Sequence, residues 1–488
     1  MHWRRTLTLL VLAAIPRSSA GQDANSPRPL GPAEALNYAQ QFLTDVVNPI
    51  SEHYFRPISH TELITAGLTG LYDAAKIPVP KTLATEVEST EPRKLLMLIT
   101  QTRISLGDID PLRGSNALRA SVLGVLKKLD PYSGLMSGAE LRRGNGISGE
   151  YGVGLEMAAA GPGLLVVKSV ALGGPAQRAG IRAKDEITHI NGRPLGGGSL
   201  ASPPGLLPVD GQQGRLQLTI RRPGAKVGRD ISLAYESYRP ETVLGTIRHT
   251  DNSWDYWIDR KNKLALIRIT TLIEGTSGEL GQVLQELKQQ GLRGLILDLR
   301  WCPGGSFIES INVAGLFLNT GIIARTKNRD GNDKEYPSDS GRSFLGFPIV
   351  ALVNGETSGG AELITAALQD HQRAIVVGQR TRGKASIQRM LPLPIPDAGL
   401  KLTNGMFLRP SGKNLHRFPE SKRTDDWGVR PDPDREFPIS PELSSQIREW
   451  SQLLAARPGS SDEALELDDP SMDPQRQYAL QVLGTLLK

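Results

Sequence analysis

Three loops in the second half of the sequence carry residue types that could act on a carbonyl group. They are WCPGGSF (301–307), NGETSGGAE (354–362) and GQRTRGKASIQR (378–389), and each follows a short apolar run. Gly304 and Gly305 in the first loop would let backbone N–H groups approach a reacting carbonyl oxygen closely, as an oxyanion hole requires. Because Gly-Gly turns are common, this loop alone does not define a site.

The second loop offers a hydroxyl group at Ser358, between an apolar run (347–353) and a helix-like run (363–369). A serine at a helix start lies near unsatisfied N–H groups and the positive end of the helix dipole, which favours developing negative charge. Serine is also a preferred helix N-cap, and this loop taken alone favours that structural role. Whether Ser358 is a nucleophile or a cap stays open at this point.

The third loop contains a candidate general base, Lys384. To deprotonate a serine, the pKa of a lysine must fall from about 10.4 toward roughly 7–8. Burial beside other cations lowers a lysine pKa in this way. No acidic residue occurs between Asp370 and Asp397, and the neighbouring cations are Arg380, Arg382 and Arg389. A solvent-exposed basic loop would have the same composition, and no histidine lies in a comparable loop, so a Ser-His-Asp triad is not supported.

The elements around these loops predict an α+β multidomain protein. Apolar strand-like runs alternate with helical runs over residues 239–440, which favours a mostly parallel sheet. Within it, RGLILDLR (293–300) is apolar enough to be a strand buried on both faces. Residues 33–140 show helical periodicity, and residues 141–238 show short strand-like runs between glycine-lined turns, which predicts a small barrel. Residues 441–488 favour a helical C-terminal tail.

Composition excludes some classes of function. The chain has 488 residues and a net charge of only +6, with no basic stripe interleaved with aromatic residues, so nucleic-acid binding is not expected. The single cysteine, Cys302, excludes intramolecular disulfides. No Cys/His cluster has the spacing of metal ligands. We therefore expect no metal and no cofactor.

The N-terminus predicts export. MHWRR supplies a charged segment, TLTLLVLAAI (6–15) an apolar segment, and Ser18-Ser19-Ala20 a small-residue cleavage site. This is the pattern of a secretory signal peptide over residues 1–20. The apolar run is about half of the roughly 20 residues that a bilayer span needs. We expect no transmembrane span after cleavage and a location in the periplasm or outside the cell.

From about residue 35 to 440, the sequence resembles the C-terminal processing peptidases, also called tail-specific proteases. Many motifs of that family occur here in the same order, which makes the resemblance specific. They are LDPYS (129–133), YGVGLEM (151–157), GGPAQRAGIRAKDEITHING (173–192), GLILDLRWCPGG (294–305), TRGKASIQ (381–388), LTNGMFLRPSGKNLH (402–416) and WGVRPD (427–432).

The resemblance implies a domain order: a helical N-terminal region, a PDZ domain, a peptidase core with a crotonase-like ββα arrangement, and the helical tail. It also implies a serine-type endopeptidase whose Ser/Lys dyad cleaves proteins or peptides recognised at their C-termini. The family's general base falls on Lys384, its orienting glutamine on Gln388, and its oxyanion-loop glycines on Gly304 and Gly305. The oligomeric state stays open.

The PDZ domain would bind the substrate by strand addition and by contacts to its terminal carboxylate. The resemblance places the carboxylate-binding loop at Gly152, Val153, Gly154 and Leu155.

The sequence departs from the family at the nucleophile. The segment TSGGAE (357–362) aligns with the family's SASASE, and the middle serine, which is the nucleophile there, falls on Gly359. Ser358 is one position too early. Neighbouring Cα atoms are about 3.8 Å apart, and successive side chains at a helix start diverge by roughly 100°. Ser358 could serve only if the adjacent glycines re-aim it toward Lys384.

Two hypotheses follow. In the first, which we prefer on sequence grounds, the protein is an exported serine-type endopeptidase in which Lys384 activates Ser358. Retention of Lys384, Gln388 and the Gly304–Gly305 loop favours it. In the second, the protein is a catalytically silent, peptidase-like PDZ binding protein, as Gly359 suggests. Thr357 and Cys302 are remote alternative nucleophiles.

Overall fold

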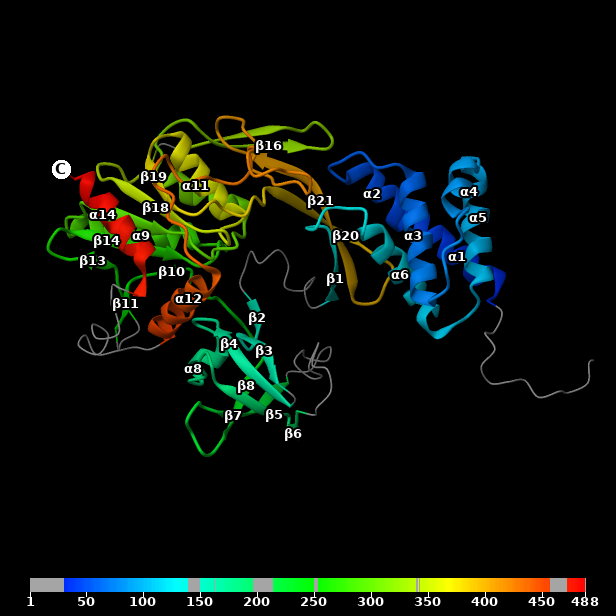
Figure 1. The fold of residues 1–488 in the computed structure, drawn as a ribbon, viewed down its shortest axis with the longest axis horizontal. Coiled ribbons are helices and arrows are strands. Elements are labelled where there is room, and N and C mark those ends of the chain that lie inside the picture. Colours follow the sequence, from blue (N-terminus) through cyan, green and yellow to red (C-terminus); the bar gives the residue numbers. More distant parts are fainter. Residues whose placement is uncertain are drawn as a thin grey trace, which may run out of the picture.

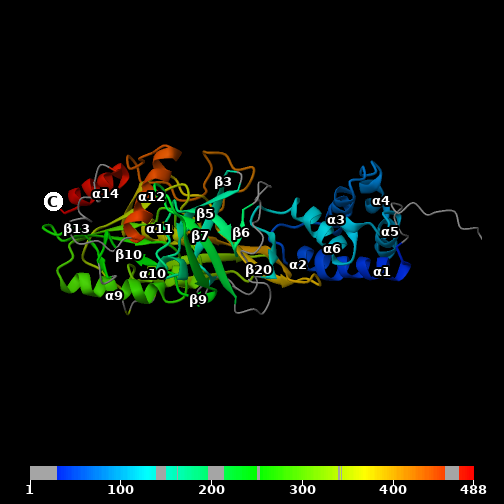
Figure 2. The same cartoon turned by 90° about the horizontal axis from the view of Figure 1, so that it is seen from below.

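The structure of the protein is a computed structural model. It describes residues 30–138, 150–161, 163–195, 214–249, 253–338, 341, 343–456 and 472–487. Figures 1 and 2 show a helical region at one end, a larger α/β core at the other, and a small β-rich unit beside the core. The predicted fold class is thus confirmed in its coarse form, a mixed α/β multidomain protein. The predicted signal peptide, residues 1–20, lies outside the described residues.

Helices build the N-terminal region. They are α1 (Pro32–Gln41), the π-helical segment η1 (Phe42–Val47), α2 (Asn48–His53), α3 (His60–Ala75), α4 (Leu83–Ser89), α5 (Pro92–Ser105), the 3-10 turn η2 (Asp110–Leu112) and α6 (Ser115–Leu126). α3 begins with a capping box, in which Ser59 Oγ accepts a hydrogen bond from Glu62 N–H and the Glu62 carboxylate accepts one from Ser59 N–H. Within the helical periodicity predicted for residues 33–140, the apolar residues of α3 that follow this spacing are buried: Leu63, Ile64, Leu68 and Leu71.

The β-rich unit lies within residues 141–238, where the sequence predicted a PDZ domain, and is called the PDZ-like unit below. Its elements are β2 (Glu150–Gly152), β3 (Leu155–Gly161), β4 (Leu164–Val170), α8 (Pro175–Arg178), β5 (Glu186–Ile190), β6 (Arg193–Pro194), β7 (Arg215–Arg221), β8 (Arg229–Ala234) and β9 (Glu236–Tyr238). The main antiparallel sheet has the order β3-β4-β5-β7-β8, so β3 lies at its edge. Alternate residues of β7 are buried in the core of this unit, namely Leu216, Leu218 and Ile220.

A second sheet, mostly parallel, forms the α/β core. Its order is β10 (Val243–Leu244), β14 (Leu264–Ile269), β15 (Gly294–Asp298), β18 (Ile349–Val353) and β19 (Ala374–Gly378), with β13 (Trp257–Asp259) also paired to β14. The helices are α9 (Thr276–Gln289), α10 (Phe307–Gly315), α11 (Gly360–Asp370) and α14 (Pro474–Thr485). Leu295 and Leu297 pack in the cluster of α9, α10 and α11, whereas Ile296 packs in the cluster of α14. β15 is therefore buried on both faces, as its apolar sequence predicted.

A third sheet joins the core to the helical region. Its order is β1 (Gly134–Ser137), β21 (Ala398–Leu408), β16 (Ile322–Asn328) and β17 (Lys334–Pro337), and β20 (Ser386–Pro392) also pairs with β21. In Figure 1 the hairpin of β20 and β21 extends from the core toward α2, α3 and α6. Leu391, Leu400 and Leu402 of this hairpin are buried in the same cluster as the helical residues. The hairpin thus anchors the helical region.

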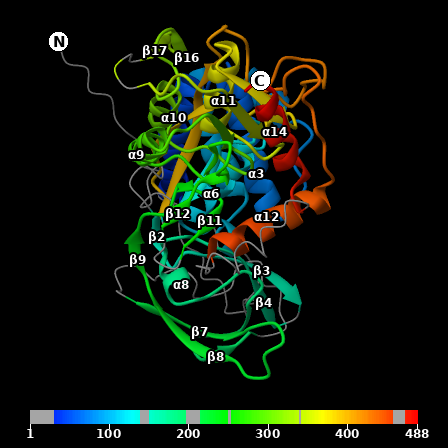
Figure 3. The same ribbon diagram turned by 90° about the vertical axis from the view of Figure 1, so that its left-hand side faces the viewer.

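Helix α12 (Pro441–Ala456) connects the core and the PDZ-like unit, and Figure 3 shows it between them. Two adjacent residues of α12 face the two parts. Glu449 pairs with Lys184 of the PDZ-like unit at 3.0 Å, and Arg448 pairs with Glu356 of the core at 3.2 Å. The short strands β11 (Ile247–Arg248) and β12 (Trp254–Asp255) lie near the same junction.

Candidate active site

The three predicted loops meet at one edge of the parallel sheet. β15, β18 and β19 run in the same direction, so the loops that follow them leave from the same carboxyl edge. Backbone hydrogen bonds join the loops. Ser358 N–H donates to Cys302 O at 3.0 Å, and Arg382 N–H donates to Thr357 O at 3.0 Å. The structure therefore brings the candidate residues of all three loops together.

Two glycines allow the backbones of the first and second loops to pack closely against each other. Gly359 precedes α11 with φ 61° and ψ −125°, a conformation that strains any residue with a side chain. A Cβ atom built on Gly359 would lie 3.1 Å from Pro303 O, which is tight. A Cβ atom on Gly304, where φ is 82°, would lie 2.5 Å from Gly360 N, which no side chain could tolerate. At the position that the family gives to its nucleophile, a side chain would therefore be strained and tightly packed against Pro303 O.

Ser358 faces the oxyanion loop. Its side chain is buried, with 3% of the residue exposed, and its hydroxyl donates to Pro303 O at 3.4 Å. In the described part of the chain, no hydrogen bond joins Ser358 Oγ to Lys384 Nζ. The predicted partners are close in the fold, but they are not in contact as a dyad.

Lys384 has the electrostatic environment that the sequence predicted, although of the three predicted arginines only Arg382 is among the main contributors. Burial lowers the pKa of Lys384 most, followed by the positive charges of Lys401 and Arg382, and the Glu362 carboxylate opposes the shift. Among the described residues no carboxylate forms an ion pair with Lys384. Its Nζ lies 5.6 Å from the ring centre of Tyr132.

Arg380, which the sequence also predicted to act on Lys384, forms hydrogen bonds with another loop instead. Its guanidinium donates to the carbonyl oxygens of Arg423, Asp425 and Trp427 and stacks on the Trp427 ring at 3.3 Å. Lys401 was missed because only the pairing of β20 with β21 brings it near. No local sequence signal could have identified it.

Glu362 connects the nucleophile turn to the lysine loop. Its buried carboxylate accepts hydrogen bonds from Gly359 N–H at 3.1 Å and from Lys384 N–H at 2.8 Å. It also accepts from Thr381 Oγ1 at 2.5 Å and Gly383 N–H at 2.6 Å. Burial raises the pKa of Glu362 to about 7, although these four donors oppose the shift. The alignment of TSGGAE with the family's SASASE places Glu362 at the final glutamate, but it does not indicate that Glu362 joins the two loops.

Gln388 lies on β20 next to a register shift between Ile387 and Gln388. Its Nε2 donates to Ser386 Oγ at 2.6 Å, and no hydrogen bond to Lys384 is formed within the described residues. The orienting role that the resemblance implies for Gln388 stays a prediction.

The first loop is held against the strand end of β14. Leu272 N–H donates to Gly304 O at 2.9 Å, and Ser306 N–H donates to Leu272 O at 2.7 Å. Among the described residues, Gly305 N–H has no acceptor, so it is available to an oxyanion. Its role in an oxyanion hole stays a prediction.

The two remote nucleophile candidates are buried. Thr357 Oγ1 donates to Leu299 O at 2.9 Å, so this hydroxyl supports the turn. Burial raises the pKa of the Cys302 thiol to about 12, which keeps it protonated and unreactive at neutral pH. Neither side chain is exposed to a substrate.

The predicted carboxylate-binding loop lies at the open edge of the PDZ-like sheet. Val153 O accepts from Ala176 N–H in α8, and Gly154 O accepts from Ala171 N–H just after β4, both at 2.9 Å, which ties the loop to α8 and to the end of β4. Leu155 opens β3 and pairs with Val170 on one side only. Among the described strands, none pairs with the other edge of β3, which is the kind of edge to which a peptide strand can be added.

Within the described residues, no group of three or more His, Cys, Asp or Glu side chains could hold a metal ion. None of the described helices has both the length and the apolar character needed to cross a membrane.

Comparison with known proteins yields two domain matches and several relatives. Residues 263–433 match peptidase family S41, and residues 166–202 match a PDZ domain. A CtpA-like serine protease of Staphylococcus aureus is 30% identical over 304 residues, which cover 61% of this chain and 58% of that protein. A carboxy-terminal-processing protease of Bartonella bacilliformis is 29% identical over 306 residues, which cover 60% of this chain and 66% of the relative.

Among solved structures, the photosystem II D1 C-terminal processing protease is 25% identical to this chain. The superposition covers 82% of this chain and 99% of that chain, with a TM-score of 0.43.

The fold and the domain matches define a protein with a peptidase core and a PDZ domain. More particularly, residues 263–433 match peptidase family S41, and the chain is similar to carboxy-terminal processing proteases over about 60% of its length, which confirms the resemblance predicted from its motifs. The chain spans 58% and 66% of the length of the two relatives.

Proposed function

We propose that this protein captures the C-termini of proteins or peptides with its PDZ domain and holds them against a peptidase core that lacks a working Ser/Lys dyad. One observation carries the second half of the proposal. Gly359, at the family's nucleophile position, has no side chain, and the neighbouring Ser358 hydroxyl donates to Pro303 O. The open edge of β3 beside the Gly152–Leu155 loop supports the first half.

Re-aiming Ser358 toward Lys384 would be costly. Ser358 N–H donates to Cys302 O, and Ser358 O accepts from Ala361 N–H, so a rotated turn loses both bonds. A buried polar group left without a partner costs about 1–3 kcal/mol. The close contact of Gly304 with the backbone of Gly360 also opposes movement of the turn. A nucleophile misplaced by about 1 Å can already lose roughly a hundredfold in rate.

The second candidate function is the serine-type C-terminal processing endopeptidase. Here Lys384 would activate Ser358, Gln388 would orient Lys384, and Gly304 and Gly305 would bind the oxyanion. The lowered pKa of Lys384 favours this candidate, because a neutral amine is what a general base requires. Catalytic hydrogen bonds are often long before substrate binds and shorten in the complex.

For location, we propose export to the periplasm or the cell exterior with cleavage after Ala20. The charged, apolar and small-residue segments of residues 1–20 support it. Recovery of Met1 by N-terminal sequencing of the protein purified from the cell envelope would contradict export with cleavage.

The test of function compares binding with cleavage. The mature protein should bind a peptide with a free C-terminal carboxylate and should not bind the same peptide as a C-terminal amide. It should leave an unfolded protein substrate intact over hours, as seen by mass spectrometry. Cleavage that disappears in both Ser358→Ala and Lys384→Ala would instead establish the endopeptidase. Equal binding of acid and amide peptides would refute capture of C-termini.

A further inference from the structure

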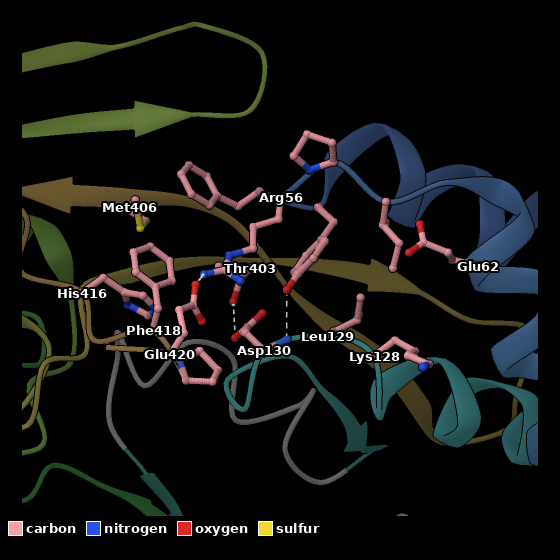
Figure 4. Close-up of a pocket in the computed structure, with 15 residues that line it drawn as sticks. Arg56, Glu62, Lys128, Leu129, Asp130, Thr403, Met406, His416, Phe418 and Glu420 are labelled. Carbon is pink, nitrogen blue, oxygen red and sulfur yellow. Dashed lines mark hydrogen bonds and ion pairs between the residues drawn. The ribbon is translucent and has the colours of Figure 1, made fainter. Parts of the chain in front are cut away.

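A pocket of about 370 Å³ opens where the helical region meets the core. Figure 4 shows its walls, which come from the segment after α2, the end of the helical region, β21 and the loop that follows β21. Tyr54, Met406 and His416 are almost completely buried in the walls, and Phe418 and Leu129 are half-buried. This size is within the range of sites that bind an organic group.

Charged side chains at the rim of the pocket already interact with one another, and Arg56 and Glu420 form an ion pair. Arg56 Nη2 contacts Glu420 Oε1 at 2.7 Å, and the guanidinium lies 4.3 Å from the centre of the Phe418 ring. The hydrogen bonds from Ser59 lower the pKa of the Glu62 carboxyl group most. The positive charge of Lys128 lowers it further by a smaller amount. A charged occupant would therefore compete with pairs that are already formed.

Asp130, the remaining carboxylate of the pocket, already accepts hydrogen bonds from other residues of the protein. Its oxygens accept hydrogen bonds from Tyr132 N–H, from both the N–H and the hydroxyl of Ser133, and from Thr403 Oγ1. Figure 4 shows Asp130 directed to Thr403. The chemistry of the walls thus favours an uncharged, apolar occupant.

His416 supplies one unused hydrogen-bond donor. Its Nδ1 accepts from Ala385 N–H at 3.3 Å, so the proton of the neutral ring is on Nε2. Burial lowers the pKa of His416 to about 4, and the ring is therefore neutral at physiological pH. Only 3% of His416 is exposed, and among the described residues its Nε2–H has no acceptor. A carbonyl oxygen in the pocket would satisfy this donor.

We propose that this pocket binds an apolar residue from an internal stretch of a polypeptide, with its side chain between Tyr54, Met406 and Phe418 and its main-chain carbonyl accepting from His416 Nε2–H. The inference rests on the proposed function, since the polypeptide is the one whose C-terminus the PDZ domain holds. A main-chain carbonyl is the neutral acceptor that every internal peptide residue carries, whereas a free terminus adds a charge.

The pocket shares a wall with the surroundings of Lys384. The His416 ring packs edge-on against Tyr132 at 5.4 Å between ring centres, and Tyr132 lies 5.6 Å from Lys384 Nζ. Ala385, whose N–H His416 accepts, directly follows Lys384. A polypeptide seated in the pocket would therefore be separated from the candidate catalytic lysine by the side chains of His416 and Tyr132.

The experiment uses the mature protein and peptide acids that carry one benzophenone side chain at graded distances from the C-terminus. After irradiation, peptide mapping by mass spectrometry locates the cross-link.

For at least one spacing, we expect the label within residues 54–58 or 403–420. We expect this label to disappear in Ile58→Trp, because the larger side chain fills the rim of the pocket. In His416→Asn, the asparagine Oδ1 can replace the histidine Nδ1 as the acceptor for Ala385 N–H, but the Nε2–H donor is lost. Labelling of the pocket should therefore fall about threefold to tenfold.

The outcomes separate the two proposals. Peptides that bind through their carboxylate yet never label the pocket would overturn this inference and leave the proposed function intact. If no peptide binds, the proposed function fails, and the pocket is then tested with N-acetyl-phenylalanine methylamide at millimolar concentration by saturation-transfer NMR. Binding of that probe that is weaker in His416→Asn would support the pocket. Equal signals from the wild type and both variants would overturn it.

Discussion

The backbone N–H of Lys384 donates to the Glu362 carboxylate at 2.8 Å, and the same carboxylate accepts from the N–H of Gly359. The residue before helix α11 and the candidate general base are therefore positioned by one buried acid. This relationship ties two loops that lie more than twenty residues apart in the sequence, and it leads to the first prediction.

The Glu362→Gln variant should change how stability depends on pH. The folded-state pKa of Glu362, about 7, is above the ordinary value, so the folded protein holds this proton more tightly than the unfolded chain. The wild type should lose stability relative to the variant as the pH rises from about 4.5 to 7, by on the order of 3 kcal/mol. Denaturant unfolding at several pH values measures the difference. Glu356→Gln, at an exposed position on the same turn, is the control. Parallel curves for wild type and Glu362→Gln would contradict the prediction.

Gly359→Ser should restore a hydroxyl at the family's nucleophile position. The variant should remain folded but lose about 1–3 kcal/mol, because the backbone at Gly359 is strained for any side chain. We expect it to cleave unfolded proteins, and we expect Lys384→Ala in the same background to abolish that cleavage. Gly359→Ala carries the same strain without the hydroxyl and should be inactive. Equal activity in the serine and alanine variants would contradict the restored dyad.

Lys384 should titrate below ordinary lysines. Burial and the neighbouring Lys401 both disfavour its charged form, so its amine becomes neutral at a lower pH. Competitive acetylation followed by mass spectrometry should show a labelling midpoint for Lys384 below that of the exposed Lys334. Lys401→Gln removes a cation and should move the midpoint upward. A midpoint equal to that of Lys334 would show that the lysine is not poised as a base.

Arg300 should be essential for stability. It is completely buried, and it contacts Asp298 at 2.9 Å and Asp473, just before α14, at 2.7 Å. Arg300→Ala would remove the buried cation that bridges Asp473 and Asp298 and leave Asp298 only its contact with Arg268, and breaking such a buried pair costs about 3–5 kcal/mol. Arg268→Ala should cost less, because Asp298 then keeps Arg300. Thermal or denaturant unfolding measures both variants, and similar losses would contradict a dominant role for Arg300.

The same buried cluster should make the wild type sensitive to acid. Burial would raise the pKa of Asp298, but the charges of Arg300 and Arg268 outweigh it and the net pKa is lowered. A lowered carboxyl pKa contributes stability above the ordinary value of about 3.9, and the contribution is lost as the pH falls below it. Arg300→Ala should show less of this loss between about pH 4 and 2. An unchanged acid profile would contradict it.

Local sequence patterns accounted for much of the fold. The run 293–300 predicted a strand buried on both faces, and β15 is such a strand, because a continuous apolar run can be satisfied only by packing on both sides. The helical spacing of Leu63, Ile64, Leu68 and Leu71 likewise predicted the buried face of α3. The β20–β21 hairpin that anchors the helical region could not be predicted in this way, since its partners lie more than two hundred residues away in the sequence.

The site was predicted less completely. The glycines at 304 and 359 and the basic surroundings of Lys384 were evident from composition. Besides burial, the charges of Lys401 and of the predicted Arg382 lower the pKa of Lys384. Lys401 lies on a paired strand, and Arg380 donates instead to the carbonyl oxygens of the loop around Trp427. Side-chain direction depends on contacts between distant segments, and a loop sequence does not contain those contacts.

The sequence by itself determined which chemical groups are available: an amine at Lys384, glycines in two turns, and a hydroxyl at Ser358 but none at Gly359. Only the tertiary structure decided where they point. Ser358 Oγ donates to Pro303 O, fifty-five positions away, and Glu362 joins the turn to the lysine loop. Periodicity and turn chemistry act over a few residues, whereas the direction of a buried hydroxyl depends on the nearest acceptor that the folded chain brings to it.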